Sequence, residues 1–253
     1  MLEQYLKDRR QKHEILLMTH IVLGHPHFDT SLRLVESMVQ AGVDLIELQI
    51  PFSEPIADGP VILRANQEAL SAGSTVEKCF DVASEVARRF DIPFLFMSYY
   101  NVLFRRGVAA FVTRMQQAGV RGAIVPDLPP EEAGDYLQLM QESLLAPIFI
   151  YSPNTNDERL KTIASYGRGF VYCVARKGVT GSETAFSSEL SSYLARARAA
   201  TSLPLAVGFG VKEKHDVDFL RGKAHIAVVG SETLRVLERG GVAAVGPFLS
   251  GLR

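Results

Sequence analysis

Two carboxylates in one short segment have the residue types and spacing for acid–base chemistry. Glu47 lies inside the apolar run 45–50, and Asp58 follows in a loop rich in proline and glycine. An apolar run that breaks into such a loop is typical of a buried strand leading into a site. Because side chains alternate along a strand, Gln49 should share the face of Glu47. A buried carboxylate must be paired, hydrogen-bonded or neutralised, so Glu47 is either a structural ion-pair partner or a reacting group.

The composition describes a globular protein with no preference for polyanions. The chain has 253 residues, 47% of them hydrophobic and 22% charged, with a formal net charge of −1. These values support a large core and give no reason to expect nucleic acid or an anionic membrane as a partner.

Cys79 and Cys173 lack zinc-ligand spacing, so no metal site is predicted. The charged amino terminus is unlike a secretory signal and no apolar run reaches the length of a bilayer span, so we expect a cytoplasmic protein.

Short apolar runs alternate with amphipathic segments along the whole chain. Strands are predicted at 15–23, 45–50, 92–97, 122–125, 146–151, 169–174, 205–207 and 226–229. Helices are predicted up to residue 12 and at 31–40, 61–70, 76–90, 108–117, 131–142, 157–165, 188–200 and 212–220. Eight strand–helix units of this kind predict a single (β/α)₈ TIM barrel over residues 1–253 with an additional N-terminal helix, and an open doubly wound sheet is the alternative. In a barrel, Glu47 and Asp58 would both face the carboxyl ends of the strands, where barrel enzymes keep their active sites.

Glycine-bearing turns follow the last three predicted strands. They are Gly178-Val179-Thr180-Gly181, Gly208-Phe209-Gly210 and Gly230-Ser231. Glycine lets backbone N–H groups approach an anion closely, and a helix that starts after the turn adds a favourable dipole. Their place after strands six to eight matches the usual phosphate site of a barrel. We expect a small phosphorylated substrate, held mostly by main chain, with the carboxylates at its other end.

The motifs, taken together, resemble those of the tryptophan synthase α subunit family almost from end to end. The resemblance is carried by 46–53 with 57–60, by 125–132, by 178–181 and by 207–210. It implies a retro-aldol cleavage of indole-3-glycerol phosphate to indole and glyceraldehyde 3-phosphate, with no cofactor bound by this chain. It also implies a partner, a pyridoxal-phosphate β subunit that receives the indole, in an α2β2 assembly.

The same resemblance assigns roles to individual residues. Glu47 would protonate C3 of the indole and then take the glycerol hydroxyl proton, and Asp58 would accept from the indole N–H. Burial should favour the neutral form of the inward glutamate, whereas a loop carboxylate closer to water should stay ionised. Without the motif, Asp58 could be a turn-former before Gly59. The remaining implied substrate contacts are Tyr99, Ile124 and Ile150 around the indole, Tyr172 as a polar neighbour, Thr180 closing on Asp58, and Gly181, Gly210, Gly230 and Ser231 around the phosphate.

Three positions depart from the family pattern near this site. Gln49 replaces a glycine, His20 replaces an aromatic residue and His25 replaces an acid. His20 has no second ligand at metal spacing, which favours a pocket-lining histidine, and His25 beside Pro26 is interpreted as a turn residue. Because all three changes lie near the predicted site, we hypothesise that the chain is a weakly active or non-catalytic subunit that still binds and activates the β subunit. A third reading, an isomerase or epimerase acting on sugar phosphates, lacks a metal-ligand set or a second strand-end base.

Overall fold

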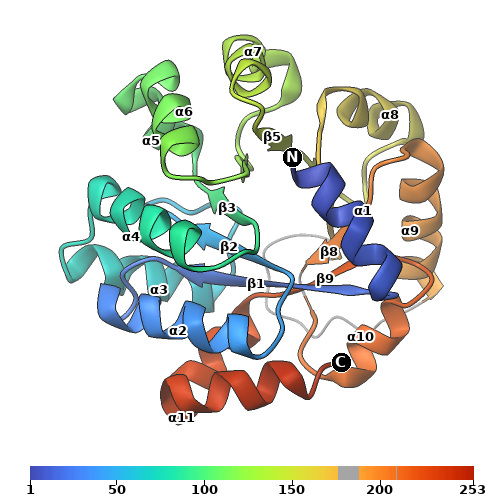
Figure 1. The fold of residues 1–253 in the computed structure, drawn as a ribbon. Coiled ribbons are helices and arrows are strands. Elements are labelled where there is room, and N and C mark those ends of the chain that lie inside the picture. Colours follow the sequence, from blue (N-terminus) through green and yellow to red (C-terminus); the bar gives the residue numbers. More distant parts are fainter. Residues whose placement is uncertain (176–187, 209) are drawn as a thin grey trace.

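The strands form a parallel barrel surrounded by helices (Figure 1). The computed structural model describes residues 1–175, 188–208 and 210–253. The sheet has nine strands in the order β5-β4-β3-β2-β1-β9-β8-β7-β6, and every pairing is parallel. The strands are β1 (Leu16–Val22), β2 (Leu45–Gln49), β3 (Phe94–Met97), β4 (Gly122–Ile124), β5 (Ala146–Ile148), β6 (Ile150–Tyr151), β7 (Val171–Val174), β8 (Leu205–Gly208) and β9 (Ile226–Val229).

The eightfold barrel predicted from the sequence is confirmed. β5 and β6 are two parts of one extended segment that is interrupted at Phe149. The first part pairs with β4 and the second with β7, so this segment connects the two ends of the strand order. Nine assigned strands therefore occupy eight barrel positions, and the open-sheet alternative is wrong.

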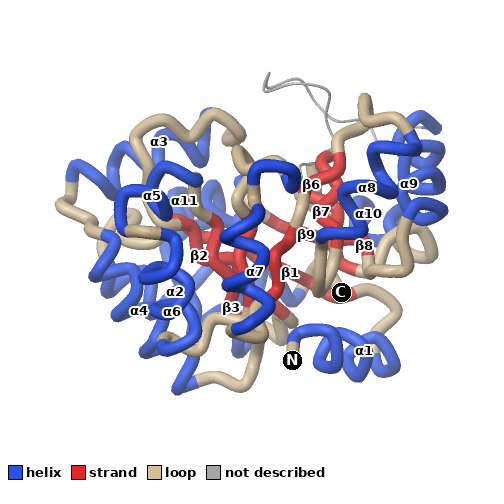
Figure 2. The backbone as a smooth tube through the Cα atoms, turned by 90° about the horizontal axis from the view of Figure 1, so that it is seen from above, coloured by secondary structure: helices blue, strands red, loops and turns tan. Residues whose placement is uncertain are grey.

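Helices cover the outside of the barrel on all sides (Figure 2). They are α1 (Leu2–Lys12), α2 (Phe28–Gln40), α3 (Pro60–Ser71), α4 (Val76–Arg89), α5 (Tyr100–Arg106), α6 (Val108–Gln117), η1 (Pro130–Glu132), α7 (Gly134–Glu142), α8 (Asp157–Tyr166), α9 (Ser188–Ala200), α10 (Lys214–Leu220) and α11 (Ser231–Ser250). The helix predicted over 131–142 is divided into η1 and α7. Two helices, α5 and α11, were not predicted. Among the described residues no helix is long and apolar enough to cross a membrane.

The N-terminal helix closes the bottom of the barrel, the end opposite the carboxyl ends of the strands. Leu2 and Leu6 are buried and join the cluster of apolar side chains that fills the barrel interior. Gly169 has a φ of 75°, which favours glycine, and a Cβ atom there would also lie 2.7 Å from the end of the Leu2 side chain. The predicted additional helix is therefore part of the core rather than an appendage.

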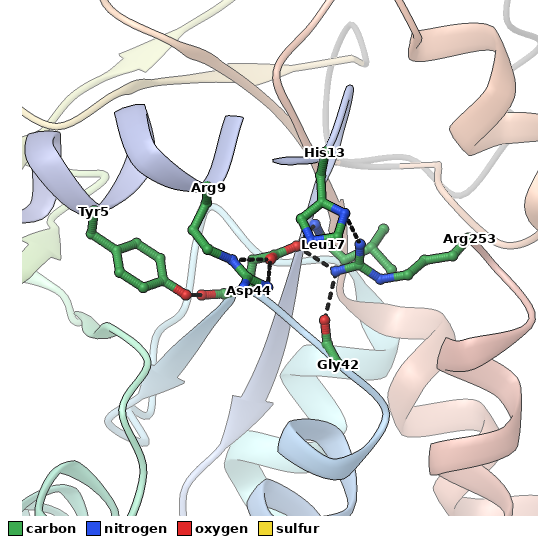
Figure 3. A network of polar contacts seen from close by, with 7 residues as sticks. All are labelled: Tyr5, Arg9, His13, Leu17, Gly42, Asp44 and Arg253. Atoms are coloured by element: carbon green, nitrogen blue, oxygen red, sulfur yellow. Dashed lines mark hydrogen bonds and ion pairs between the residues drawn. The ribbon is translucent and has the colours of Figure 1, made fainter. Parts of the chain in front are cut away.

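A buried carboxylate ties this end together (Figure 3). Asp44, fully buried before β2, accepts hydrogen bonds from the backbone N–H of Leu17 at 2.9 Å and from Arg9 Nε at 2.9 Å. Arg9 binds Oδ1, whereas Oδ2 accepts from Leu17 and also pairs with Arg253 at the carboxyl terminus. The backbone carbonyl oxygen of Asp44 accepts from the Tyr5 hydroxyl at 2.9 Å. One side chain thus links α1, β1 and the end of the chain.

Substitution of Asp44 should destabilise the whole barrel. Asp44→Asn would leave the two arginines without their charged partner, and because both are partly exposed they can be rehydrated. We expect a loss of about 3 kcal/mol in the free energy of unfolding, the low end for a broken buried ion pair. Urea unfolding measures it, with Asp8→Asn on the exposed face of α1 as a control that should change stability by less than about 0.5 kcal/mol. A D44N protein as stable as the control would contradict this role.

One histidine makes the fold sensitive to acid. Burial, with the nearby charges of Arg10 and Arg198, lowers the pKa of His225 to about 4, and its Nδ1 accepts from the backbone N–H of Leu205 at 2.9 Å. The unfolded chain binds a proton at this histidine from about pH 6.5 downward, whereas the folded chain resists until about pH 4. Stability should therefore fall as the pH drops through that window. Urea midpoints at several pH values should show a shallower decline for His225→Asn, and an identical decline would contradict the assignment.

Candidate active site

A cavity of about 430 Å³ opens at the carboxyl ends of the strands. It brings together nine of the residues that the sequence singled out: His20, Glu47, Asp58, Ile124, Ile150, Tyr172, Gly210, Gly230 and Ser231. Thr180 and Gly181 lie outside the described residues. The cavity therefore assembles the predicted site from segments that are far apart in the chain.

Glu47 projects into the barrel from β2 and is paired with a histidine. The side chain is 3% exposed, and the parallel register places His20 of β1 directly beside it. His20 Nδ1 lies 3.0 Å from Glu47 Oε1, while Oε2 has no hydrogen-bond partner among the described residues. One oxygen of the carboxylate is thus fixed and the other is available to a ligand.

The histidine responds electrostatically to the two acids. Burial acts to lower the pKa of His20, but the charge and hydrogen bond of Glu47, together with the charge of Asp58, raise it above the usual value of 6.5. A carboxylate nearby favours the protonated, charged form of a histidine. The protonation of His20 therefore depends on the two acids beside it.

Asp58 lies in the loop before α3 and is more deeply buried than predicted. Only 8% of it is exposed, and burial raises its pKa, so the expected position closer to water is wrong. Gln49 Nε2 donates to its Oδ2 at 2.7 Å, and the Tyr99 hydroxyl donates to the same oxygen at 3.0 Å. The backbone N–H of Ala57 donates to the Tyr99 oxygen at 3.0 Å. The loop is therefore anchored to the barrel wall through Tyr99.

Tyr172 lines the cavity from β7, directly beside Ile150 of β6 in the parallel register, and Ile124 adds a further apolar side chain to the lining. Burial, followed by the charges of Glu47 and Asp58, raises the pKa of Tyr172 well above 10, which keeps its hydroxyl neutral. At Gly208 a Cβ atom would lie 2.3 Å from that hydroxyl oxygen. Glycine at this strand end is therefore required by the tyrosine beside it.

Three of the singled-out residues are absent from the cavity lining: Tyr99, His25 and Gln49, whose contact with Asp58 is given above. Tyr99 is fully buried and stacks on Phe52 with 5.1 Å between ring centroids, so it contacts Asp58 rather than lining the cavity. His25 Nδ1 lies 3.2 Å from Glu68 Oε2 and is also absent from the lining. His25 thus interacts with α3 and not with the two reacting acids.

Another part of the cavity lining suits an anion. Gly210 follows β8, and Gly230 and Ser231 lie at the start of α11, where unpaired backbone N–H groups and the helix dipole favour negative charge. Sequence reasoning missed two cations of the lining, Lys212 and Arg235. Each follows a glycine turn within a few residues, a signal that could have identified them. Arg235 is paired with Glu232 at 3.0 Å, which leaves Lys212 as the more available charge.

Lys212 should contribute to the binding of a phosphate group. We expect Lys212→Met to weaken binding of glycerol 3-phosphate about tenfold, because a charge-assisted contact contributes roughly 1.5 kcal/mol or more. Lys214→Met is the matched control, since Lys214 lies in the next turn, bonds to the Arg253 carbonyl and is absent from the cavity lining. Calorimetric titration measures both. Equal affinities of the two variants would remove Lys212 from the anion site.

These features define a parallel barrel whose cavity is lined by two buried acids and by glycine-bearing turns suited to an anion. The chain belongs to the tryptophan synthase alpha chain family, whose model matches residues 6–244. The tryptophan synthase alpha chain of Desulforapulum autotrophicum is 63% identical over 252 residues, and that of Syntrophotalea carbinolica is 60% identical over 253. Each match covers 100% of both chains.

Solved structures give the same result. A tryptophan synthase structure from Mycobacterium tuberculosis superposes with a TM-score of 0.93 at 30% identity, covering 99% of this chain and 96% of that one. A mutant α-subunit from Pyrococcus furiosus superposes with a TM-score of 0.87 at 31% identity, covering 94% of this chain and 97% of the other. The chain is thus a lyase subunit of this family. A non-catalytic regulator is not favoured, and any weakening of turnover stays a prediction.

Proposed function

We propose that the cavity cleaves indole-3-glycerol phosphate into indole and glyceraldehyde 3-phosphate, with Glu47 and Asp58 as the reacting acids. The observation that carries the proposal is one cavity lined both by two buried carboxylates and by glycine-bearing turns that suit a phosphate. The apolar side chains of the same lining suit an indole ring. The substrate can therefore lie along the cavity with its ring beside the acids.

Glu47 transfers two protons in sequence. Protonated on Oε2, it delivers a proton to C3 of the indole, which makes the ring an electron acceptor. The resulting carboxylate then takes the proton from the hydroxyl on the adjacent glycerol carbon. The carbon–carbon bond breaks, its electrons return to the indole ring, and the carbonyl of the aldehyde forms. Since one proton is given and one is taken, the side chain ends as it began and no cofactor is needed.

Asp58 stabilises the charge that develops between these steps. Protonation at C3 places positive charge on the indole nitrogen, and a carboxylate that accepts from its N–H lowers the energy of this state. Both hydrogen bonds from Gln49 and Tyr99 go to Oδ2, so Oδ1 is the oxygen directed to the substrate. Ile124 and Ile150 hold the ring, and Gly210, Gly230 and Ser231 hold the phosphate. Thr180 and Gly181 are proposed from the family motif alone.

The chain works with a β subunit, as its family membership implies. We propose an α2β2 assembly in which that pyridoxal-phosphate subunit receives the indole. Large apolar side chains near the mouth of the cavity support a partner surface there: Ile56, in the loop of Asp58, is 71% exposed, and Phe104 on α5 is 68% exposed. Light scattering of the mixed subunits measures the stoichiometry.

Removal of either acid should abolish cleavage. We expect Glu47→Gln to lower kcat at least ~1000-fold and Asp58→Asn at least ~100-fold, with KM changed less, because both act mainly in the transition state. Indole release from indole-3-glycerol phosphate, with and without the β subunit, is the measurement. Glu85→Gln on the exposed side of α4 should behave like the wild type. An E47Q variant within threefold of wild-type turnover would contradict the proposed role.

A further inference from the structure

Two buried polar side chains beside the reacting carboxylates have no part in the proton transfers described above. His20 is 4% exposed on β1, and Gln49 is fully buried at the end of β2. Burying a polar side chain is unfavourable unless it is hydrogen-bonded. Both of these residues make that bond to a reacting carboxylate.

We propose that His20 and Gln49 are positioning residues: each holds one oxygen of a reacting carboxylate so that the other oxygen faces the substrate. This inference rests on the proposed cleavage reaction and assigns the geometry that makes it efficient. Because these two residues depart from the family pattern, the sequence alone suggests that they weaken turnover. Their contacts with the two carboxylates suggest instead that they support it.

The His20 contact is specified by the strand pairing. His20 and Glu47 are register partners on β1 and β2, so both side chains point to the barrel interior at the same level. With the proton of Glu47 on Oε2, Oε1 can only accept, so at 3.0 Å from Oε1 the imidazole donates from Nδ1. Oε2 of Glu47 and Nε2 of His20 both lack a partner among the described residues and belong to the cavity wall. Oε2 of Glu47 is therefore available to the substrate, whereas His20 also interacts with Gln49.

The Gln49 contact has the same logic. The amide nitrogen of Gln49 donates to Asp58 Oδ2 at 2.7 Å. The hydroxyl of Tyr99, directly before α5, donates to the same oxygen at 3.0 Å. Two donors to one oxygen fix the carboxylate plane. They also leave Oδ1 without a hydrogen bond from the part of the chain that the structure describes. A shorter or apolar residue at position 49 would leave Tyr99 as the single donor.

The pairing also affects the proton that Glu47 carries. Between the two transfers Glu47 is a carboxylate, and the Nδ1–H of His20 stabilises it. The groups that act on the imidazole are Glu47 and Gln49 from β2 and Asp58 from its loop, and Tyr172 of β7 lies near the same two acids. Charged residues farther along the cavity wall are Lys212, Glu232 and Arg235. The net effect of the acids is to raise the pKa of His20, so a loss of its charge should appear above the ordinary histidine range.

The test separates the hydrogen bond from the charge. His20→Leu removes both, whereas His20→Asn puts an amide N–H close to the position of Nδ1 but cannot titrate. We expect kcat of H20L to fall 10- to 100-fold with KM within threefold, and H20N to recover to within about fivefold of wild type. In H20N, the pH profile of kcat should lose the change that the titration of His20 causes in the wild type. His27→Leu, at an exposed histidine before α2, is the control and should match wild type.

Gln49 is tested with an isosteric change. Gln49→Met keeps the length of the side chain and removes the donor, so we expect kcat to fall about tenfold. Gln49→Gly tests the competing hypothesis, because an obstructive glutamine would give a gain. A rise in kcat in either variant would overturn the positioning role.

A spectroscopic measurement tests the inference even if the His20 variants fail to fold, because it uses the wild-type protein and Glu47→Gln. In full-length protein labelled at the histidine ring nitrogens, NMR should show His20 protonated at Nδ1 and titrating above the ordinary range, and Glu47→Gln should lower its midpoint. H20L turnover within threefold of wild type, or a His20 midpoint unchanged by E47Q, overturns the inference while the cleavage assignment stands. A wild-type chain that releases no indole overturns the proposed function, and the positioning role with it, even where NMR finds the pairing.

Discussion

The parallel register of β1 on β2 places an imidazole beside a carboxylate inside the barrel, and the reacting geometry depends on this pair. A lone carboxylate at that depth would be neutral or would destabilise the fold. With His20 opposite Glu47, one oxygen is bonded and the other faces the cavity. Gln49, at the end of the same strand, does the same for Asp58. Two adjacent strands thus hold both acids.

The two ends of the barrel have separate tasks. At the bottom, Asp44 binds the N-terminal helix, the first strand and the carboxyl terminus in one network, and α1 seals the interior with leucines. At the top, loops and helix starts carry the cavity. Because the bottom is fixed by buried ionic and apolar contacts, the strands can hold buried polar groups at the top without losing their register.

Much of the barrel follows from the sequence, and the exceptions have physical reasons. The eight strands were predicted because each is a short apolar run bounded by turn residues. α11 was missed because Gly240, Gly241 and Pro247 indicate breaks, and the helix does deviate at Gly241, where φ is 66°. The burial of Asp58 and the His20–Glu47 contact could not be foreseen, because both depend on how distant segments meet. Lys212 and Arg235 were overlooked in favour of the glycines before them.

The most direct test of the account is a crystal structure of the Glu47→Gln variant with indole-3-glycerol phosphate bound. The account predicts the indole N–H within hydrogen-bond distance of Asp58 Oδ1, C3 facing residue 47, and the phosphate against Gly230, Ser231 and Lys212. It also predicts that His20 and Gln49 touch the side chains at 47 and 58 and not the substrate. A substrate bound in the reverse direction, or a phosphate beside Asp58, would contradict it.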